Sequence, residues 1–235
     1  TMDQNISFAT VETLRALLDK GQITATQLLE HTLSEISRTN PTLNSFILIT
    51  ESLARTQAEA ADVRIEQGKA ASPIDGIPIA VKDLYDTAGI VTAGGTAAFE
   101  KRTPNYDSYV VDKLQRAGAL IVGKTNTHEL ALGGTTNNPH YGPTHNPWNL
   151  ENVPGGSSGG SGAALASGQV SLALGTDTGG SVRIPSAFCG VTGLKPTYGL
   201  IGKSGIIPLS KTLDHAGPMA RSAFDCALLL NQMTG

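Results

Sequence analysis

Apolar side chains recur with helical spacing in the first third of the chain. Residues 10–39 predict two amphipathic helices separated at Gly21, and residues 52–67 predict an alanine-rich helix. The second helix begins with a capping box, Thr24-Ala25-Thr26-Gln27, in which side chains at both ends satisfy free backbone groups. Residues 44–49, between the helices, predict a short strand.

The pattern changes after Gly68, where short apolar runs alternate with helical stretches. The runs predict strands at 77–81, 119–122 and 170–174, and the helical stretches predict helices at 107–117, from 161 to 166 and at 222–233. Strands that alternate with helices through short connections favour an α/β fold, with a sheet covered by helices on both faces.

Composition narrows the class of protein. The chain has 235 residues, 40% of them hydrophobic and only 16% charged, which argues against disorder. A formal net charge of −3 makes nucleic acid an unexpected direct partner. No apolar run approaches the length of a membrane span, and the first residues lack the features of a secretory leader. We therefore expect a cytoplasmic protein without membrane contact.

Two glycine-dense turns contain the most informative serines. Residues 154–161 read PGGSSGGS, and residues 175–181 read GTDTGGS. Both tracts run directly into core-forming apolar segments, which a flexible linker does not do. Glycine lets successive N–H groups point into one concavity, the geometry that an oxyanion requires. A serine at such a turn is well placed as a nucleophile, so the sequence indicates acyl transfer.

Two other motif matches are weaker. Residues 118–125 fit the phosphate-loop pattern, but the four middle residues that should form the loop are apolar and predict a strand. We therefore expect no nucleotide site, and a turn at Lys124 and Thr125. Ser158 fits the nucleophile elbow of α/β-hydrolases, with Asp214 and His215 downstream. Adjacent residues rarely fold back onto each other in those roles, which disfavours this alternative.

Lys82 is the strongest alternative to histidine as a base for the serine. It ends a predicted buried strand, and burial lowers the pKa of a lysine toward the range of a general base. The residue pattern alone leaves a second interpretation open, in which Lys82 pairs with Asp83 or reaches solvent.

These motifs together resemble the amidase signature family. The resemblance rests on the two glycine-serine tracts, on IAVKD at 79–83, on GKTN at 123–126 and on FCGVTGLKPT at 188–197, and it runs from about residue 8 to the end. It implies one domain over 1–235, with a helical segment at about 1–70 and a catalytic core at about 71–235. It also implies a mixed central sheet covered by helices on both faces.

The resemblance further implies a hydrolase that cleaves the C–N bond of carboxamides through an acyl-enzyme, without metal or cofactor. In its Ser–cis-Ser–Lys triad, Ser181 would be the nucleophile, Ser157 the bridging serine after a cis peptide bond, and Lys82 the base. The remaining roles would fall to the oxyanion-hole amides of Thr178, Gly179, Gly180 and Ser181, to the supporting residues Ser158, Asp177 and Arg183, and to the substrate-binding residues Ala131, Leu132 and Gly133.

The chain departs from the family in length, because members are about twice as long and the C-terminal half of the family domain is absent. A homodimer or a complementing C-terminal segment would then be the partner, beside a small amide substrate. The glutamine-hydrolysing subunit of a tRNA-dependent amidotransferase shares the same motifs, but tends to carry an acidic residue where His128 stands. The sequence favours the stand-alone amidase and keeps two alternatives, that glutamine-hydrolysing subunit or an inactive fragment. It does not identify the amide, ester or carbamate that is cleaved.

Overall fold

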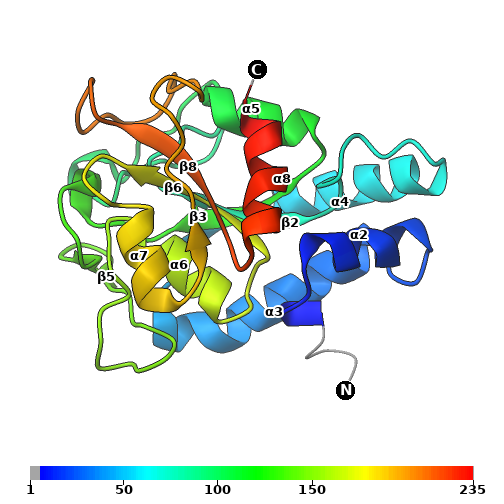
Figure 1. Cartoon of the computed structure of the whole chain (residues 1–235), viewed down its shortest axis with the longest axis horizontal. Coiled ribbons are helices and arrows are strands. Elements are labelled where there is room, and N and C mark those ends of the chain that lie inside the picture. The colour runs from blue at the N-terminus through cyan, green and yellow to red at the C-terminus, as the bar shows by residue number, and fades with distance from the viewer. Residues whose placement is uncertain (1–5, 235) are drawn as a thin grey trace.

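A six-stranded mixed sheet forms the centre of the protein (Figure 1). The computed structural model describes residues 6–234; residues 1–5 and 235, at the two ends of the expected domain, lie outside the described residues. The strand order is β1-β3-β2-β6-β8-β7, in which β2 runs parallel to β3 and β6, and the other pairs are antiparallel. The expected mixed sheet is thus confirmed.

The elements follow the alternating pattern of the sequence. In chain order they are α2 (Val11–Asp19), α3 (Ala25–Leu43), β1 (Phe46–Ile49), α4 (Glu51–Glu66), β2 (Pro78–Lys82), α5 (Tyr109–Arg116), β3 (Leu120–Thr125), β4 (Asn137–Asn138), β5 (Gly142–Pro143), α6 (Gly159–Ala166), β6 (Leu172–Asp177), α7 (Arg183–Cys189), β7 (Thr192–Gly193), β8 (His215–Ala220) and α8 (Ala223–Met233). The capping box of α3 is formed as predicted, since Thr24 and Gln27 bond each other's backbone N–H.

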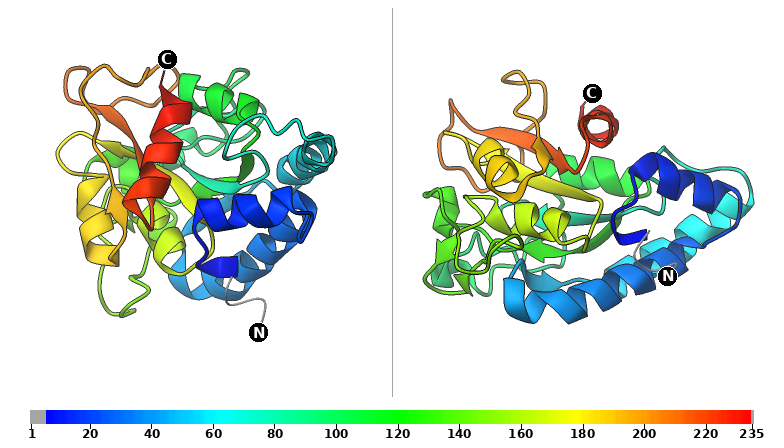
Figure 2. Two further views of the ribbon diagram at one scale, coloured as in Figure 1. Left: turned by 45° about the vertical axis from the view of Figure 1, so that its right-hand side comes forward. Right: turned by 60° about the horizontal axis from the view of Figure 1, so that its bottom comes forward.

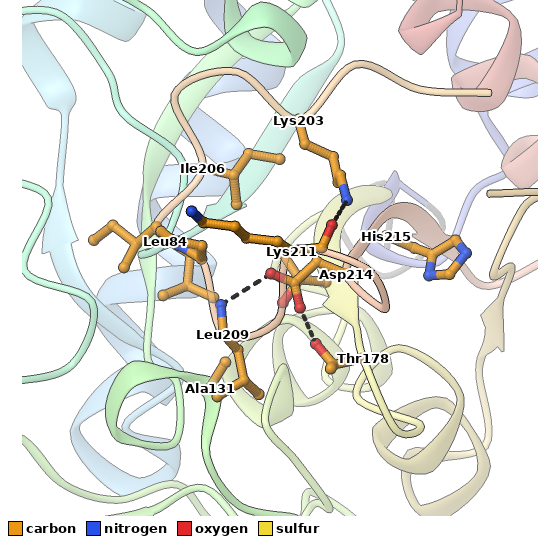
Figure 3. A pocket seen from close by; sticks show the side chains of 12 residues that line it. Leu84, Ala131, Thr178, Lys203, Ile206, Leu209, Lys211, Asp214 and His215 are labelled. Atoms are coloured by element: carbon orange, nitrogen blue, oxygen red, sulfur yellow. Dashed lines mark hydrogen bonds between the residues drawn. The ribbon is translucent and has the colours of Figure 1, made fainter. Parts of the chain in front are cut away.

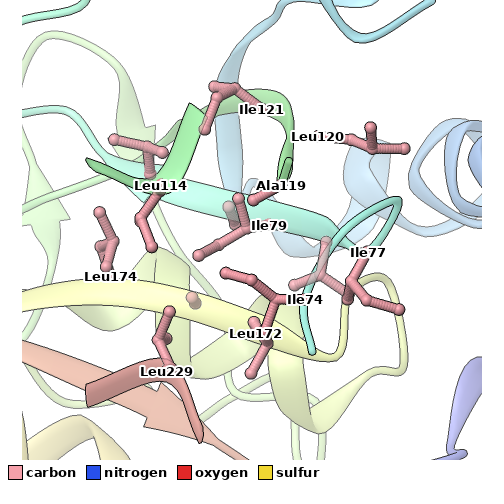
Figure 4. Close-up of a cluster of buried hydrophobic side chains, with 14 of the residues drawn as sticks. Ile74, Ile77, Ile79, Leu114, Ala119, Leu120, Ile121, Leu172, Leu174 and Leu229 are labelled. Atoms are coloured by element: carbon pink, nitrogen blue, oxygen red, sulfur yellow. The ribbon is translucent and has the colours of Figure 1, made fainter. Parts of the chain in front are cut away.

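Helices lie against both faces of this sheet, and the two faces differ in side-chain size. Ile79, Leu172 and Leu174 share one face, where they pack with residues of α5 and α8 (Figure 4). The other face presents the small residues Ala80 and Ala173, which let α6 approach closely. In Figure 2, α3 and α8 lie on opposite sides of the strands. Within residues 6–234, none of the helices combines the length and apolar character that crossing a bilayer requires.

Gly160 fixes the close approach of α6 to the strands. A Cβ atom at this position would lie 2.5 Å from the carbonyl oxygens of both Ser45 and Asn126, and the Gly160 N–H donates to Asn126 O at 3.1 Å. No side chain fits there unless backbone moves.

We expect Gly160→Ala to destabilise the protein by about 1–3 kcal/mol, because the added methyl group overpacks a backbone contact. A loss of stability would be diagnostic, since replacing glycine with alanine in a helix interior normally raises the free energy of unfolding. Urea unfolding measures the change. Gly134→Ala is the control, because a Cβ at this exposed position meets nothing within 4 Å; an equal loss in both variants would contradict the packing explanation.

The structure corrects the expected turn at Lys124 and Thr125. Both residues belong to β3, which is longer than predicted. Lys124 is fully buried, and its Nζ donates to Tyr85 O at 2.7 Å and to Thr92 Oγ1 at 2.8 Å. The Lys124 ammonium also lies 3.5 Å from Asp83 Oδ1. This buried pairing explains how a lysine extends an otherwise apolar strand.

Candidate active site

Lys82 is the last residue of β2 and is completely buried. Its Nζ lies 2.6 Å from Ser157 Oγ, 2.8 Å from Thr176 Oγ1 and 2.9 Å from Ser158 Oγ. These three hydroxyls come from the segment before α6 and from the end of β6, the strand that pairs with β2. The fold thus places one amine among three uncharged hydroxyl groups.

Burial lowers the pKa of Lys82 well below its ordinary value, against a weaker opposing influence from the charges of Asp177 and Asp214. Lys82 forms no ion pair within residues 6–234, so the open interpretation in which it pairs with Asp83 does not describe this structure. A lysine in these surroundings holds its proton weakly, which suits a base.

Ser157 is held by its backbone. The Gly156–Ser157 peptide bond is cis, as predicted. The Ser157 carbonyl oxygen accepts hydrogen bonds from Thr127 Oγ1 at 3.0 Å and from His128 N at 3.1 Å, while the Thr136 hydroxyl donates to the nearby Gly155 carbonyl at 2.8 Å. These donors hold the backbone around Ser157, and the Ser157 hydroxyl is directed at Lys82.

Ser181 lies beside this pair without being bonded to it through its side chain. The Ser158 N–H donates to the Ser181 carbonyl at 3.3 Å, which brings the two glycine-rich segments into contact. The Ser181 hydroxyl has no hydrogen-bond partner within the described chain, and the residue is 8% exposed. The hydrogen bond between Ser157 and Ser181 that a proton path needs is therefore not formed here.

Asp177 organises the turn that leads to Ser181. Its carboxylate accepts both Nε and one terminal N–H of Arg183 at 2.9 Å, and the backbone N–H groups of Gly180 and Val182 at 2.8 and 3.2 Å. Burial alone would raise the pKa of Asp177, but these donors outweigh it and hold the pKa below its ordinary value. The Asp177 carboxylate thus stabilises the turn by accepting hydrogen bonds from the residues that follow it.

This arrangement differs from the expected oxyanion hole at one position. The Gly180 amide donates to the Asp177 carboxylate at 2.8 Å, in a turn in which Gly180 adopts a φ of 132°. In the described part of the chain, the amides of Thr178, Gly179 and Ser181 donate to no acceptor. Three of the four expected amides are therefore free to bind an anion.

A cavity of about 170 Å³ adjoins the site (Figure 3). Thr176 and Thr178 line one side of it, while the serines and Lys82 are not in its lining. Of the expected substrate-binding residues, Ala131 lines the cavity, whereas Leu132 is 72% exposed and Gly133 lies beneath the His128 ring. The rest of the lining comes mainly from residues 203–215, of which the sequence singled out only Asp214 and His215, and those as partners of the elbow motif.

The nucleophile elbow built on Ser158 is not formed. His215 Nδ1 lies 2.6 Å from Leu213 O and 3.2 Å from Asp177 O, while its Nε2 lies 3.3 Å from Lys195 Nζ. Within residues 6–234 it makes no hydrogen bond with Ser158, whose Oγ is directed at Lys82 and at the backbone of Thr176. The adjacent Asp214 and His215 point to different partners, as the sequence indicated.

Sequence reasoning missed three threonine hydroxyls: Thr176 contacts Lys82, Thr127 donates to the Ser157 carbonyl and Thr136 donates to the Gly155 carbonyl. It also missed Asp214 as a structural group: its carboxylate accepts the Thr178 hydroxyl at 2.5 Å and the Leu209 and Ser210 amides at 2.9 Å. The position of Thr176 in the second glycine-rich tract was a usable signal, because parallel β2 and β6 end at the same edge.

Comparisons with a family model and with curated proteins both match most of this chain. A family model described as Amidase matches residues 27–235. The curated A subunit of glutamyl-tRNA(Gln) amidotransferase from Coxiella burnetii (strain Dugway 5J108-111) is 50% identical over 226 residues, which cover 96% of this chain and 47% of that protein. The chain spans about half the length of the curated relatives that it matches.

Solved structures agree at the level of the fold. The peptide amidase from Stenotrophomonas maltophilia has 37% identity and a TM-score of 0.91, over 97% of this chain and 48% of that one. A protein from a vestigial complex, described in connection with the evolutionary origins of an s-triazine catabolic enzyme, has 41% identity and a TM-score of 0.95. That match covers 97% of this chain and 50% of the other.

Proposed function

Because this chain belongs to the amidase family, we propose that it carries the catalytic centre of an enzyme that hydrolyses the C–N bond of carboxamides. The observation that carries this proposal is the buried Lys82 amine, 2.6 Å from the Ser157 hydroxyl, with the segment of Ser181 in contact with that of Ser158. The expected one-domain arrangement, with its catalytic core at about 71–235, is part of the same proposal.

The hydrogen bonds around Lys82 support one direction for the proposed proton transfer. A neutral amine has two N–H donors and one lone pair. Ser158 Oγ uses its own proton on Thr176 O at 3.3 Å, so it accepts one N–H of Lys82, and we assign the second N–H to Thr176 Oγ1. The lone pair is then left for Ser157, whose hydroxyl proton moves to Lys82.

Attack follows from that transfer. Rotation of the Ser181 side chain brings its hydroxyl to Ser157, which takes the proton as it gives its own to Lys82. Ser181 Oγ then adds to the amide carbonyl, and the Thr178, Gly179 and Ser181 amides hold the oxyanion. The leaving amine receives its proton back through Ser157, and water releases the acid from Ser181.

Thr176→Val is expected to lower kcat/KM about tenfold to a hundredfold, because it leaves one N–H of a buried amine without an acceptor. The ascending limb of the pH–rate profile should also move to lower pH, since a lost hydroxyl acceptor destabilises the ammonium form of Lys82. Thr176→Ser, which keeps the hydroxyl, should retain the wild-type rate and the wild-type position of the ascending limb. An unmoved limb in Thr176→Val would mean that the threonine has only a packing role.

A second candidate function is hydrolysis of glutamine within a tRNA-dependent amidotransferase. The 50% identity to relatives with that name supports this function, whereas the sequence motifs alone favoured a stand-alone amidase. The name implies partner subunits for those relatives. For this chain a second copy, a partner subunit or a complementing C-terminal segment is part of the proposal, since the chain spans about half of their length.

Ammonia release from a panel of simple primary amides and from L-glutamine tests both candidates, with Ser181→Ala as the blank. Release from simple amides by the protein alone supports the amidase, whereas release from glutamine that depends on an added partner supports the amidotransferase function. Release from no amide under either condition, or equal release by Ser181→Ala, would contradict the proposed function.

A further inference from the structure

The cavity beside Thr178 combines an apolar wall with positive charge. Leu84, Ile206 and Leu209 form part of the wall, and Lys203 and Lys211 are the two cations in the lining, with Asp214 as its one carboxylate (Figure 3). An apolar channel that has a free cation selects a ligand with a short hydrocarbon chain and an anionic end. Whether Lys203 or Lys211 is free depends on the partners that each already has.

Asp214 does not neutralise either lysine. Its carboxylate accepts the Thr178 hydroxyl and the amides of Leu209 and Ser210, and it forms no ion pair in the described part of the chain. These donors fold the loop back onto Thr178 and explain why a carboxylate stands there. Neither Lys203 nor Lys211 is therefore paired directly with a carboxylate in the described part of the chain.

The Lys203 ammonium group is also occupied by partners within the protein. Its Nζ donates to Tyr198 Oη at 3.2 Å and to the Lys211 carbonyl at 3.0 Å, and it lies 4.5 Å from the centre of the Tyr198 ring. Lys203 thus ties together the two ends of the loop that covers the cavity. Its role is structural.

Lys211 is the free cation. Its Nζ has no hydrogen bond or ion pair within residues 6–234, and in Figure 3 its side chain extends across the cavity toward Leu84 and Ile206. Arg183, a cation close to Thr178 in sequence, has its guanidinium engaged by both oxygens of Asp177. Among these described cations, Lys211 alone is left to meet an anionic group at the far end of the cavity.

We propose that Lys211 binds a carboxylate at the distal end of the acyl group, so that the preferred substrates are monoamides of short dicarboxylic acids. The inference rests on the proposed function, because it places the amide carbonyl at the Thr178–Ser181 turn. Lys211 acts as a specificity-determining residue: the apolar wall contacts the methylene groups, and the ammonium forms a charge-assisted hydrogen bond to the carboxylate.

Glutaramate and valeramide form the matched pair for a test, since they share a carbon chain that ends in a carboxylate or in a methyl group. We expect wild type to favour glutaramate in kcat/KM and Lys211→Met to lose about tenfold on glutaramate alone. Lys211→Arg should restore most of the preference, and added salt should weaken it, because the ammonium is exposed. Lys69→Met, at an exposed lysine outside the cavity, is the control.

Equal losses on both amides in Lys211→Met, or no preference for glutaramate in wild type, would overturn the inference. Failure to hydrolyse either amide would instead count against the proposed function. In that case calorimetric binding of glutarate decides the inference by itself: weaker binding to Lys211→Met than to wild type supports it, and equal binding overturns it.

Discussion

Replacing Ser181 with alanine is expected to abolish amide hydrolysis, with a fall in kcat of at least about 10⁴-fold. The variant removes the proposed nucleophile and leaves the Lys82–Ser157 pair and the turn around Asp177 unchanged. The Ser181 hydroxyl has no partner within residues 6–234, so its removal leaves no buried group unsatisfied, and stability should change by no more than about 0.5 kcal/mol. Steady-state kinetics and urea unfolding measure the two effects.

Ser204→Ala is the matched control, because Ser204 is exposed and its side chain makes no hydrogen bond in the described chain. It should keep full activity. Activity that survives in Ser181→Ala but is lost in Ser158→Ala would transfer the nucleophilic role to the serine of the elbow motif.

Lys82→Met is expected to lower kcat/KM by about 10²–10⁴-fold, the range that a general base contributes. Methionine fills a similar volume but has no lone pair able to take the Ser157 proton. Lys82→Arg should fail to rescue, because arginine remains charged and cannot act as a base. Circular dichroism on both variants verifies that they are folded.

The pH dependence of wild-type kcat/KM gives a second readout of Lys82. Only the neutral amine accepts a proton, so activity is lost as pH falls through the pKa of Lys82 in the folded protein. Burial lowers that pKa, and we expect an ascending limb well below the ordinary lysine value of about 10.4. The limb should disappear in Lys82→Met. A normal rate and an unchanged limb in this variant, together with loss in His215→Asn, would contradict the assignment of the base.

Much of the helical framework could be predicted from local pattern. The capping box at Thr24 and the apolar spacing of residues 10–39 are properties of one helix at a time, and they do not depend on what the helix packs against. The cis bond before Ser157 and the approach of Lys82 to the serines followed from the family resemblance, because the glycine-rich tracts fit few other structures.

What could not be predicted depends on contacts distant in sequence. Strand β8 contains Gly217 and Pro218, which hide its strand character, yet it pairs with all of β6 in the fold. Lys124 continues β3 only because Tyr85 O, Thr92 and Asp83 meet its ammonium in the core. The Gly180 amide was misassigned for the same reason, since nothing local indicates that Asp177 folds back to accept it.

The most direct measurement is to label the protein with a fluorophosphonate probe and to locate the adduct by peptide mass spectrometry. The probe reacts with an activated serine hydroxyl and does not require the natural substrate to be known. We predict a single adduct on Ser181, none in Ser181→Ala, and slow labelling in Lys82→Met. An adduct on Ser157 or Ser158, or labelling that persists in Ser181→Ala, would contradict the assignment of Ser181 as the nucleophile activated through Ser157 by Lys82.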